Sequence, residues 1–304
     1  MNNYINKTYC LVDVSLGACI PSYVKNIHSH KSASYLSRFL SILNIKCIKP
    51  NLEKNDWENE CIDYDVVILF DTYRNYAYYA SKIESACGNK TRLVLYLWNP
   101  VSFSSDFKKI SSRWEICSFS KDDSERFNFL YVETFYNPEW YLEPNDKITS
   151  DVFFIGTDKG RKSLLNDVKK ELNRYHVISD IRIVDNRKAL FNRSYSFYQS
   201  YQNCIKNICR TKALLEILQQ GQTGLSLRCM EALFFNKKII TNNLIIKESP
   251  LYSKDRVFII GETPWSQIKD FLESPIMPFD NVILEAFSFK SFIERIINKK
   301  AFDL

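Results

Sequence analysis

The sequence predicts an α/β protein made of two Rossmann-like βα domains in tandem. Short, almost wholly apolar segments of strand length alternate with longer segments whose apolar residues recur at helical spacing. This alternation lapses once, near the middle of the chain, and then resumes. Strands that are apolar on both faces belong to parallel sheets covered by helices on both sides. The chain of 304 residues is long enough for two such domains at roughly 100–200 residues each.

The first domain is expected over residues 1–140. Its helices are predicted at residues 32–43 and 76–87, and Gly88 stands directly after the second, where a C-cap glycine belongs. Its strands are predicted at residues 8–14, 45–48, 65–70, 93–97 and 115–119. Residues 134–150 contain two prolines and a polar run, and we interpret them as a linker.

The second domain is expected over residues 151–304. Its predicted strands are residues 152–155, 181–184, 213–218, 238–241 and 256–260, and its predicted helices are residues 163–175, 195–207, 224–235 and 289–299. Tyr195, Tyr198 and Tyr201 are spaced three apart, which favours a packed helix face over a sugar-stacking platform. The last helix is amphipathic and should pack on the outside of one domain, and a return onto the N-terminal domain is one option.

Composition excludes several classes of protein. The chain has 41 basic and 35 acidic residues, for a net charge of +6, and no apolar run approaches the ~18 residues of a membrane helix. No secretory signal is evident, so a cytoplasmic location is expected, with the cytoplasmic face of the inner membrane as a variant. The nine cysteines are scattered among apolar segments, which indicates reduced thiols. Lysines are spread among nearly as many acids, so nucleic acid is not an expected partner.

Motifs of other enzyme classes are missing from the sequence. It has no Walker loop, no Gly-x-Gly-x-x-Gly, no Gly-x-Ser-x-Gly and no zinc cysteine pairs. The chain also has only seven glycines, so each is expected where glycine alone serves. Glycines that follow predicted strands include Gly17, Gly156 with Gly160, and Gly221 with Gly224. Ligands of open α/β sheets bind at those strand ends.

Two of these glycine loops point to an anionic ligand. Gly156 is predicted to make a sharp turn, and Lys159 and Arg161 after it either contact diphosphate oxygens or form a solvated basic loop. Around Gly224, a buried strand ends in a glycine-containing loop, and a helix opens with small polar residues whose free amides favour an anion. The alternative for this second loop is ordinary strand–helix packing with an N-cap.

The second loop also carries a family resemblance. The residues concerned are Thr223-Gly224-Leu225-Ser226-Leu227, then Glu231-Ala232-Leu233, followed by Lys237-Lys238-Ile239-Ile240-Thr241-Asn242. Over these twenty or so residues the chain resembles the donor-sugar loop and helix of GT-B glycosyltransferases. Such enzymes have two Rossmann-like domains with a cleft between them, and the strand near Gly156 is similar to the start of their nucleotide-binding domain.

The resemblance implies a set of donor-binding residues. In the family, the counterpart of Glu231 hydrogen-bonds the nucleotide ribose, and the loop amides hold the sugar and pyrophosphate. Thr223 replaces a glutamate common in retaining members, which leaves retaining and inverting chemistry open. Arg228 replaces the usual proline and is suited to clamp a pyrophosphate or an acidic sugar. The donor set is therefore Gly156, Lys159, Arg161, Gln222, Thr223, Gly224, Leu225, Ser226, Arg228 and Glu231.

The first domain is expected to supply the acceptor side and the chemical step. Asp13 and Asp71 follow predicted strands, and each is either a catalytic carboxylate or a loop cap. His28, with His30 nearby, is the remaining candidate base. Gly17 would shape the acceptor loop. Asp63-Tyr64-Asp65 resembles a metal motif but precedes a strand, so we predict no metal and no cofactor.

These observations predict a metal-independent glycosyltransferase. It would move a sugar from a nucleotide donor to a growing bacterial surface glycan, because length and composition resemble those of lipopolysaccharide-core, O-antigen and capsule enzymes. The expected partners are the nucleotide sugar, a glycan or glycolipid acceptor and, through the basic charge, the inner membrane surface. The alternative is a non-catalytic nucleotide- or glycan-binding protein on the same scaffold.

Overall fold

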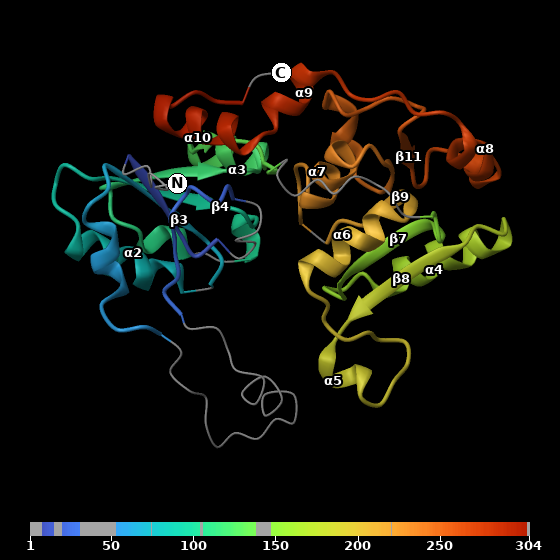
Figure 1. Cartoon of the computed structure of the whole chain (residues 1–304), viewed down its shortest axis with the longest axis horizontal. Helices are drawn as coiled ribbons and strands as arrows, with labels where there is room; N and C mark the ends of the chain where they lie inside the picture. Colours follow the sequence, from blue (N-terminus) through green and yellow to red (C-terminus); the bar gives the residue numbers. More distant parts are fainter. Residues whose placement is uncertain are drawn as a thin grey trace. The chain divides into compact units, whose positions relative to one another are not determined.

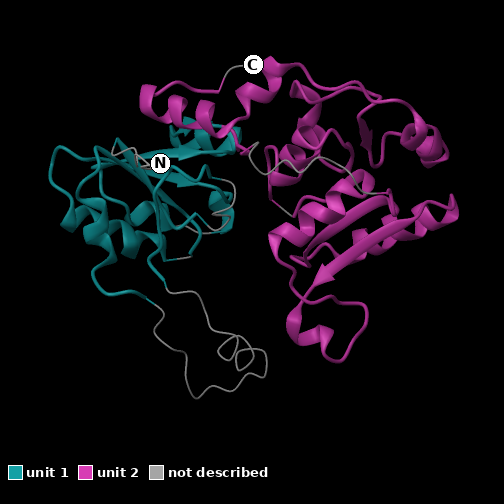
Figure 2. Cartoon of the chain, viewed as in Figure 1, with its two compact units in different colours: residues 1–132 teal, residues 133–304 magenta. Residues whose placement is uncertain are grey.

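The structure is a computed structural model that describes residues 8–14, 20–30, 53–73, 75–103, 106–137, 147–219 and 221–302. The chain divides into two compact units, Met1–Val132 and Glu133–Leu304 (Figures 1 and 2). Each unit contains a sheet whose strands all pair in parallel, flanked by helices. The predicted α/β class, with two Rossmann-like sheets in tandem, is confirmed.

Unit 1 is built on a six-stranded sheet of order β2-β1-β3-β4-β5-β6. Its strands are β1 (Tyr9–Val12), β2 (Asn26–Ile27), β3 (Val66–Phe70), β4 (Arg92–Leu97), β5 (Trp114–Ser118) and β6 (Leu130–Tyr131). Its helices are α2 (Tyr76–Ala86), α3 (Lys121–Phe127) and the short 3-10 helices η2 (Trp57–Cys61), η3 (Val101–Phe103) and η4 (Asp106–Lys109). Strands β2 and β6 and helix α3 were not predicted, because each is too short to show a periodic pattern.

The core of unit 1 lies between α2 and the sheet. Tyr76, Tyr79 and Ile83 recur at helical spacing on α2 and are buried against the strands. All five residues of β3 are buried, as a strand covered on both faces requires. Gly88 does not make the expected left-handed cap, because α2 ends at Ala86 and Cys87 is extended. The predicted helix at 32–43 and strand at 45–48 lie outside the described residues.

Unit 2 is built on a five-stranded sheet of order β11-β10-β9-β7-β8. Its strands are β7 (Ser150–Thr157), β8 (Ser179–Val184), β9 (Thr211–Glu216), β10 (Lys238–Thr241) and β11 (Val257–Ile259). Its helices are α4 (Lys162–Arg174), α5 (Asn186–Ala189), α6 (Tyr201–Cys209), α7 (Leu227–Phe234), α8 (Ile268–Glu273), α9 (Asn281–Ala286), α10 (Phe289–Asn298) and the short η6 (Leu244–Glu248) and η7 (Trp265–Gln267).

Two predicted segments of unit 2 have a structure other than the one expected. Helix α6 begins at Tyr201, because residues 195–200 form a loop rather than the predicted first turns. Residues 134–137, expected to start a linker, are buried. Phe135 contacts Phe292 of α10, with ring centroids 4.2 Å apart, so the amphipathic last helix packs on the segment that opens its own unit.

Two general features of the fold bear on function. The seven cysteines within the described residues are buried. Among the described helices, none is long and apolar enough to cross a bilayer.

Candidate functional site

The strand order of unit 2 creates a reversal point next to β7. From β7 the chain passes through α4 to β8 on one side, and later enters β9 on the other side of β7. Helices that leave a sheet in opposite directions open a crevice outside the carboxyl ends of the two diverging strands, where ligands of open α/β sheets bind. The carboxyl ends of β7 and β9 therefore mark the candidate site.

Arg161 bridges these two strand ends. Its Nη2 donates to the carbonyl of Thr157 on β7 at 2.7 Å, and its Nη1 donates to the carbonyl of Ile217, just beyond β9, at 2.7 Å. Burial and the neighbouring positive charge of Arg228 lower the pKa of Arg161. Arg161 is therefore held between the carboxyl ends of β7 and β9 by backbone carbonyls, and the positive charge of Arg228 acts on it.

Gly156 lies inside β7 and does not make the predicted sharp turn. A Cβ at this position would come 3.2 Å from Nη2 of Arg161 and 3.2 Å from Cζ of Phe154. The turn comes later, at Lys159 (φ 46°) and Gly160 (φ 80°). A side chain at position 156 would therefore require Arg161, which crosses over it, or Phe154 to shift.

Lys159 belongs to the same basic cluster. Burial and the positive charge of Arg161 lower the pKa of Lys159. Lys159 and Gly160 are exposed and Arg161 is half-buried, so the solvated alternative stays open for Lys159.

Arg228 and Glu231 form an ion pair on α7. Arg228 Nη1 lies 2.5 Å from Glu231 Oε2, and Arg228 Nη2 donates to the carbonyl of Ile155 on β7 at 3.1 Å. The Tyr201 hydroxyl donates to Glu231 Oε1 at 3.0 Å. Burial raises the pKa of Glu231, while Arg228 and Tyr201 act in the opposite direction. Both carboxylate oxygens of Glu231 are thus engaged within the protein, so Glu231 orients Arg228.

The loop before α7 is shaped by two glycines with left-handed backbone. Gly221 (φ 77°) and Gly224 (φ 88°) adopt angles that other residues reach only with strain. The carbonyl of Gly224 accepts a hydrogen bond from Asn243 Nδ2 at 3.0 Å, and Ser226 caps α7 by accepting from the Arg228 amide at 3.1 Å. The strand–helix packing alternative is therefore present in this loop, together with the features that suit an anion.

The remaining predicted loop residues differ in exposure. Leu225 is only 3% exposed, so its side chain packs inward and only its backbone can face a ligand. Gln222 and Thr223 are half-buried.

Glu216 is a member of this site that the sequence did not reveal. It ends β9, is 3% exposed, and accepts from Thr241 Oγ1 at 2.7 Å, from Cys229 Sγ at 3.1 Å and from Ser226 Oγ. Its carboxylate thereby ties β9 to β10 and to the cap of α7. The available signal was the single acid within the otherwise apolar segment 213–218, since a buried strand rarely carries a charge.

In unit 1 the sheet reverses between β1 and β3, and the two predicted carboxylates follow these strands. Asp13 (φ 58°) is 2% exposed and accepts from the Ser29 amide at 2.9 Å and from Ser29 Oγ at 2.6 Å; burial raises its pKa. Asp71 accepts from the amides of Trp98 (2.8 Å) and Asn99 (3.1 Å), and burial raises its pKa to about 7. Both carboxylates therefore brace the strand ends.

His30 rather than His28 connects to Asp13. Ser29 Oγ, which donates to Asp13, lies 2.7 Å from His30 Nδ1, and His30 Nε2 lies 3.3 Å from the Tyr79 hydroxyl. Since Ser29 has one hydroxyl proton, His30 Nδ1 must supply the proton in its bond with Ser29. His28 is exposed, and its Nε2 lies 3.3 Å from Asn26 Nδ2. Gly17, predicted to shape the acceptor loop, lies outside the described residues.

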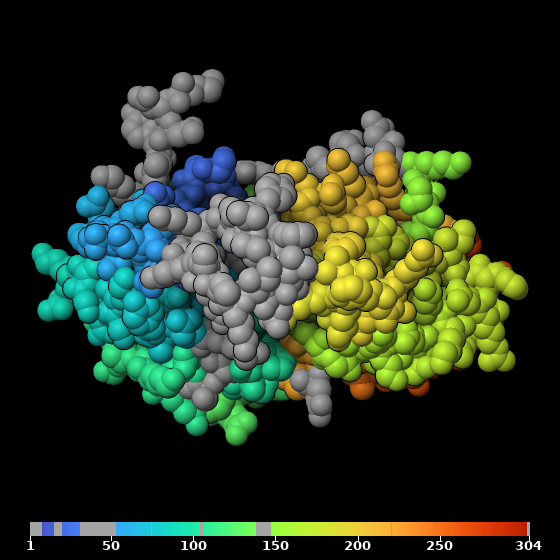
Figure 3. All heavy atoms as spheres, turned by 90° about the horizontal axis from the view of Figure 1, so that it is seen from below, coloured from blue at the N-terminus to red at the C-terminus, as the bar shows by residue number. Residues whose placement is uncertain are grey.

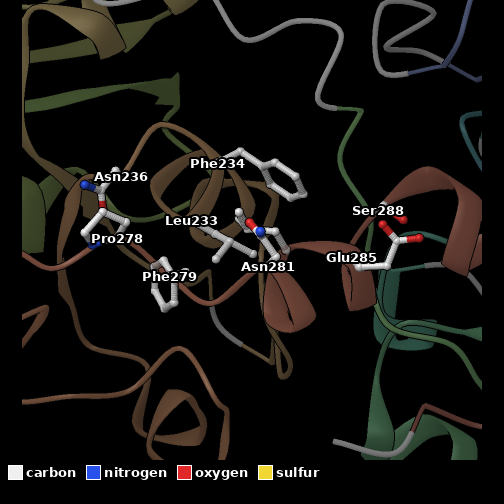
Figure 4. A pocket seen from close by; sticks show the side chains of 9 residues that line it. Leu233, Phe234, Asn236, Pro278, Phe279, Asn281, Glu285 and Ser288 are labelled. Atoms are coloured by element: carbon white, nitrogen blue, oxygen red, sulfur yellow. The ribbon is translucent and has the colours of Figure 1, made fainter.

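Two further features lie apart from these sites. Asp63 and Asp65 precede β3, as predicted, and within the described ranges no three His, Cys, Asp or Glu side chains are grouped as a metal site would require. A pocket of about 690 Å³ lies beyond the C-terminal end of α7 (Figure 4). It is lined by Leu233, Phe234, Asn236, Pro278, Phe279, Asn281, Leu284, Glu285 and Ser288, none of which belongs to the predicted donor set.

Comparison with known proteins yields likenesses among solved structures only. No protein-family model matches the chain, and no curated protein matches it. A solved structure described as an alpha-glucosyltransferase in complex with UDP and a 13-mer DNA containing a HMU base is similar over 98% of this chain and 80% of its own. The sequence identity is 12% and the TM-score is 0.42. A likeness of this extent does not assign an activity.

Proposed function

We propose that unit 2 binds a nucleotide sugar at the crevice between β7 and β9, and that the protein transfers the sugar to an acceptor. The observation that carries this proposal is the pair of guanidinium groups, Arg161 and Arg228, held at the carboxyl ends of a parallel sheet. Only Arg228 has a carboxylate partner among the contacts described above, whereas Arg161 donates to carbonyls. A diphosphate would relieve the repulsion between the two cations and accept the bidentate hydrogen bonds that arginine offers.

The loop that precedes α7 supplies the second part of this donor site. Gly221 and Gly224 leave room for the backbone to approach a sugar or phosphate, and the N-terminus of α7 favours negative charge. The resemblance of residues 223–233 to the GT-B donor loop supports the same assignment. Two arginines can neutralise a leaving diphosphate without a divalent ion, so we propose a metal-independent transfer.

Unit 1 is proposed to supply the acceptor side. In an inverting transfer, the acceptor hydroxyl oxygen bonds to the anomeric carbon, the bond from that carbon to the diphosphate oxygen breaks, and a base takes the hydroxyl proton. We assign the base to His30 Nε2, because the chain from Asp13 through Ser29 holds the proton on Nδ1. The proposed acceptor is a bacterial surface glycan or glycolipid.

The donor assignment is tested by thermal shift with a panel of nucleotides and nucleotide sugars, because a ligand of the native state raises Tm. Removing Arg228 alone would leave Glu231 buried without its ionic partner, so the informative variants are Glu231→Gln and the double variant Arg228→Gln/Glu231→Gln. We expect one nucleotide family to stabilise the wild type and Glu231→Gln but not the double variant. Arg174→Gln, on the exposed face of α4, is the matched control, since Arg174 is 72% exposed.

Two outcomes would redirect the proposal. If Glu231→Gln abolishes stabilisation as fully as the double variant, Glu231 contacts the nucleotide, as the family resemblance implies. If no nucleotide stabilises the protein, the crevice is not a donor site.

Activity is then measured with glycan and glycolipid acceptors, with duplex DNA that does or does not carry hydroxymethylated bases, and with EDTA. Binding without turnover on any acceptor would favour a non-catalytic nucleotide-binding protein.

A further inference from the structure

Residues 185–200 of unit 2, here called the aromatic loop, display large apolar side chains to solvent. Phe191 is 91% exposed, Tyr198 66%, Phe197 51% and Leu190 42%. None of the residues from 187 to 200 is buried. In Figure 1 the loop, with α5, stands away from the sheet of its unit, and its yellow-green to yellow atoms lie on the face shown in Figure 3. Four large apolar side chains exposed within one short loop indicate an interaction surface, whereas isolated exposed apolar residues are common.

The backbone of this loop is held by hydrogen bonds, so the display does not result from a loose chain. Asp185 caps α5 by accepting from the amides of Arg187 (3.1 Å) and Lys188 (3.0 Å). Ser196 pairs with the end of β8, donating to Ile183 at 2.8 Å and accepting from the Asp185 amide at 3.1 Å. These contacts join the two ends of the loop and direct its apolar side chains outward.

The charge of the loop favours an anionic surface. It contains three basic residues, Arg187, Lys188 and Arg193, and a single acid, Asp185. The carboxylate of Asp185 is occupied by the α5 amides and by Lys188, whose Nζ lies 3.4 Å away. Aromatic side chains flanked by lysine and arginine suit the interface of an anionic bilayer, where the rings enter the headgroup region and the cations meet lipid phosphates.

The aromatic loop lies at the same end of the sheet as the candidate donor site. The loop follows β8, which pairs in parallel with β7, so the carboxyl ends of both strands lie at the same end of the sheet. Lys162, the residue after Arg161, places its Nζ 4.0 Å from the centre of the Tyr195 ring, and Lys188 places its own 4.9 Å from that ring. A bilayer contacted by this loop would therefore lie beside the donor edge of unit 2.

We propose that the aromatic loop docks the protein on anionic lipid bilayers, with Phe191, Phe197 and Tyr198 entering the headgroup region and the basic residues contacting lipid phosphates. This inference goes beyond sugar transfer and does not depend on it. It assigns a membrane-contact role to specific residues, where the net charge alone indicated only a general tendency.

Flotation of the full chain with phosphatidylcholine vesicles, with and without phosphatidylglycerol, tests the proposal. We expect the wild type to bind the anionic vesicles. Phe191→Ser/Phe197→Ser should lower this binding at least about tenfold. Arg187→Gln/Arg193→Gln should lower it about tenfold, and added salt should have the same effect on the wild type. Met277→Ser/Val282→Ser is the matched control, because these residues are 79% and 67% exposed elsewhere in unit 2. The control should bind like the wild type.

Three results would overturn the proposal: no binding of the wild type to anionic vesicles, equal loss in the control variant, or self-association that depends on Phe191 and Phe197 in the absence of lipid. The last result would assign the loop to contact between copies of the chain. Nucleotide stabilisation of Tm, measured on the same variants, separates this test from that of the donor site, since loop variants should retain it.

Discussion

The carboxylate of Glu231 is 2.5 Å from the guanidinium of Arg228, and both groups are largely withdrawn from water, with side-chain exposures of 2% and 16%. They are three positions apart on α7, and the Tyr201 hydroxyl of α6 donates to the other carboxylate oxygen. Glu231, which the family resemblance would place against the nucleotide, therefore holds the side chain of Arg228 in position. The same arrangement governs how the protein responds to loss of either partner.

Arg228→Gln is expected to destabilise unit 2 by about 3–5 kcal/mol, because it leaves a buried carboxylate without its ionic partner. An unpaired buried carboxylate has a raised pKa, so it stabilises the fold below its unfolded pKa of about 4.3 and loses that contribution as pH rises. The defect should therefore be smaller in acid than at neutral pH, as measured by urea unfolding. Glu231→Gln should cost much less, and equal losses in the two variants would argue against this ion pair.

Gly156→Ala is expected to destabilise the protein by about 1–3 kcal/mol, because the added methyl group meets Arg161 and Phe154 at 3.2 Å. Displacement of Arg161 should also weaken nucleotide stabilisation. Gly88→Ala is the control: no atom lies within 4 Å of the Cβ position there, and the backbone is not left-handed. Its Tm should stay unchanged or rise slightly. An unchanged Tm in Gly156→Ala would mean that Arg161 does not cross over this residue.

Asp71 should make the stability of unit 1 depend on pH. Its folded pKa of about 7 exceeds the unfolded value, so its contribution is full below about pH 4 and is lost as pH rises through about 7. The expected fall in unfolding free energy over this range is about 2–4 kcal/mol. Asp71→Asn removes the titrating group and should flatten that part of the curve in denaturant titrations. A curve of unchanged slope in the variant would assign the dependence to another group.

His30→Gln is expected to lower kcat of the proposed transfer by about 10²–10⁴, with little change in the donor KM, because it removes the base without touching the donor site. His28→Gln should leave kcat within about twofold, since its ring is exposed and is not part of the chain through Ser29. Ser29→Ala should lower kcat less than His30→Gln, because it removes only the hydrogen bond that orients the imidazole. The opposite ranking of the two histidine variants would return the role to His28.

The sequence was informative where one local pattern decides the structure. Strand β10 has the predicted bounds, Lys238–Thr241, because an apolar run between two polar turns leaves little freedom. The predicted start of this helix was wrong, because the spacing of the tyrosines suggested a helix from residue 195 whereas α6 begins at Tyr201. Ser196 instead pairs with β8, and Tyr195 stacks under two lysines. Both are long-range contacts that no local period encodes.

The same distinction between local patterns and long-range contacts applies to the candidate site. Arg161 and Arg228 were predicted near an anion site because basic residues beside glycine loops are a local signal. The engagement of Glu231 by Tyr201 and the reason for glycine at position 156 depend on side chains brought together by the completed sheet. Likewise, the chain from Asp13 through Ser29 to His30 requires strand β1 and the segment after β2 to lie side by side.

The pairing of Ser196 with the end of β8 has a consequence for solubility. Strand β8 is at the margin of its sheet, where unsatisfied amides and carbonyls can recruit a strand from another molecule. Because Ser196 already bonds the carbonyl of Ile183 and the amide of Asp185, these two groups cannot pair with a strand of another molecule. A proline at position 196 would remove the amide that caps Ile183, and would thereby open this margin to intermolecular β-pairing and aggregation.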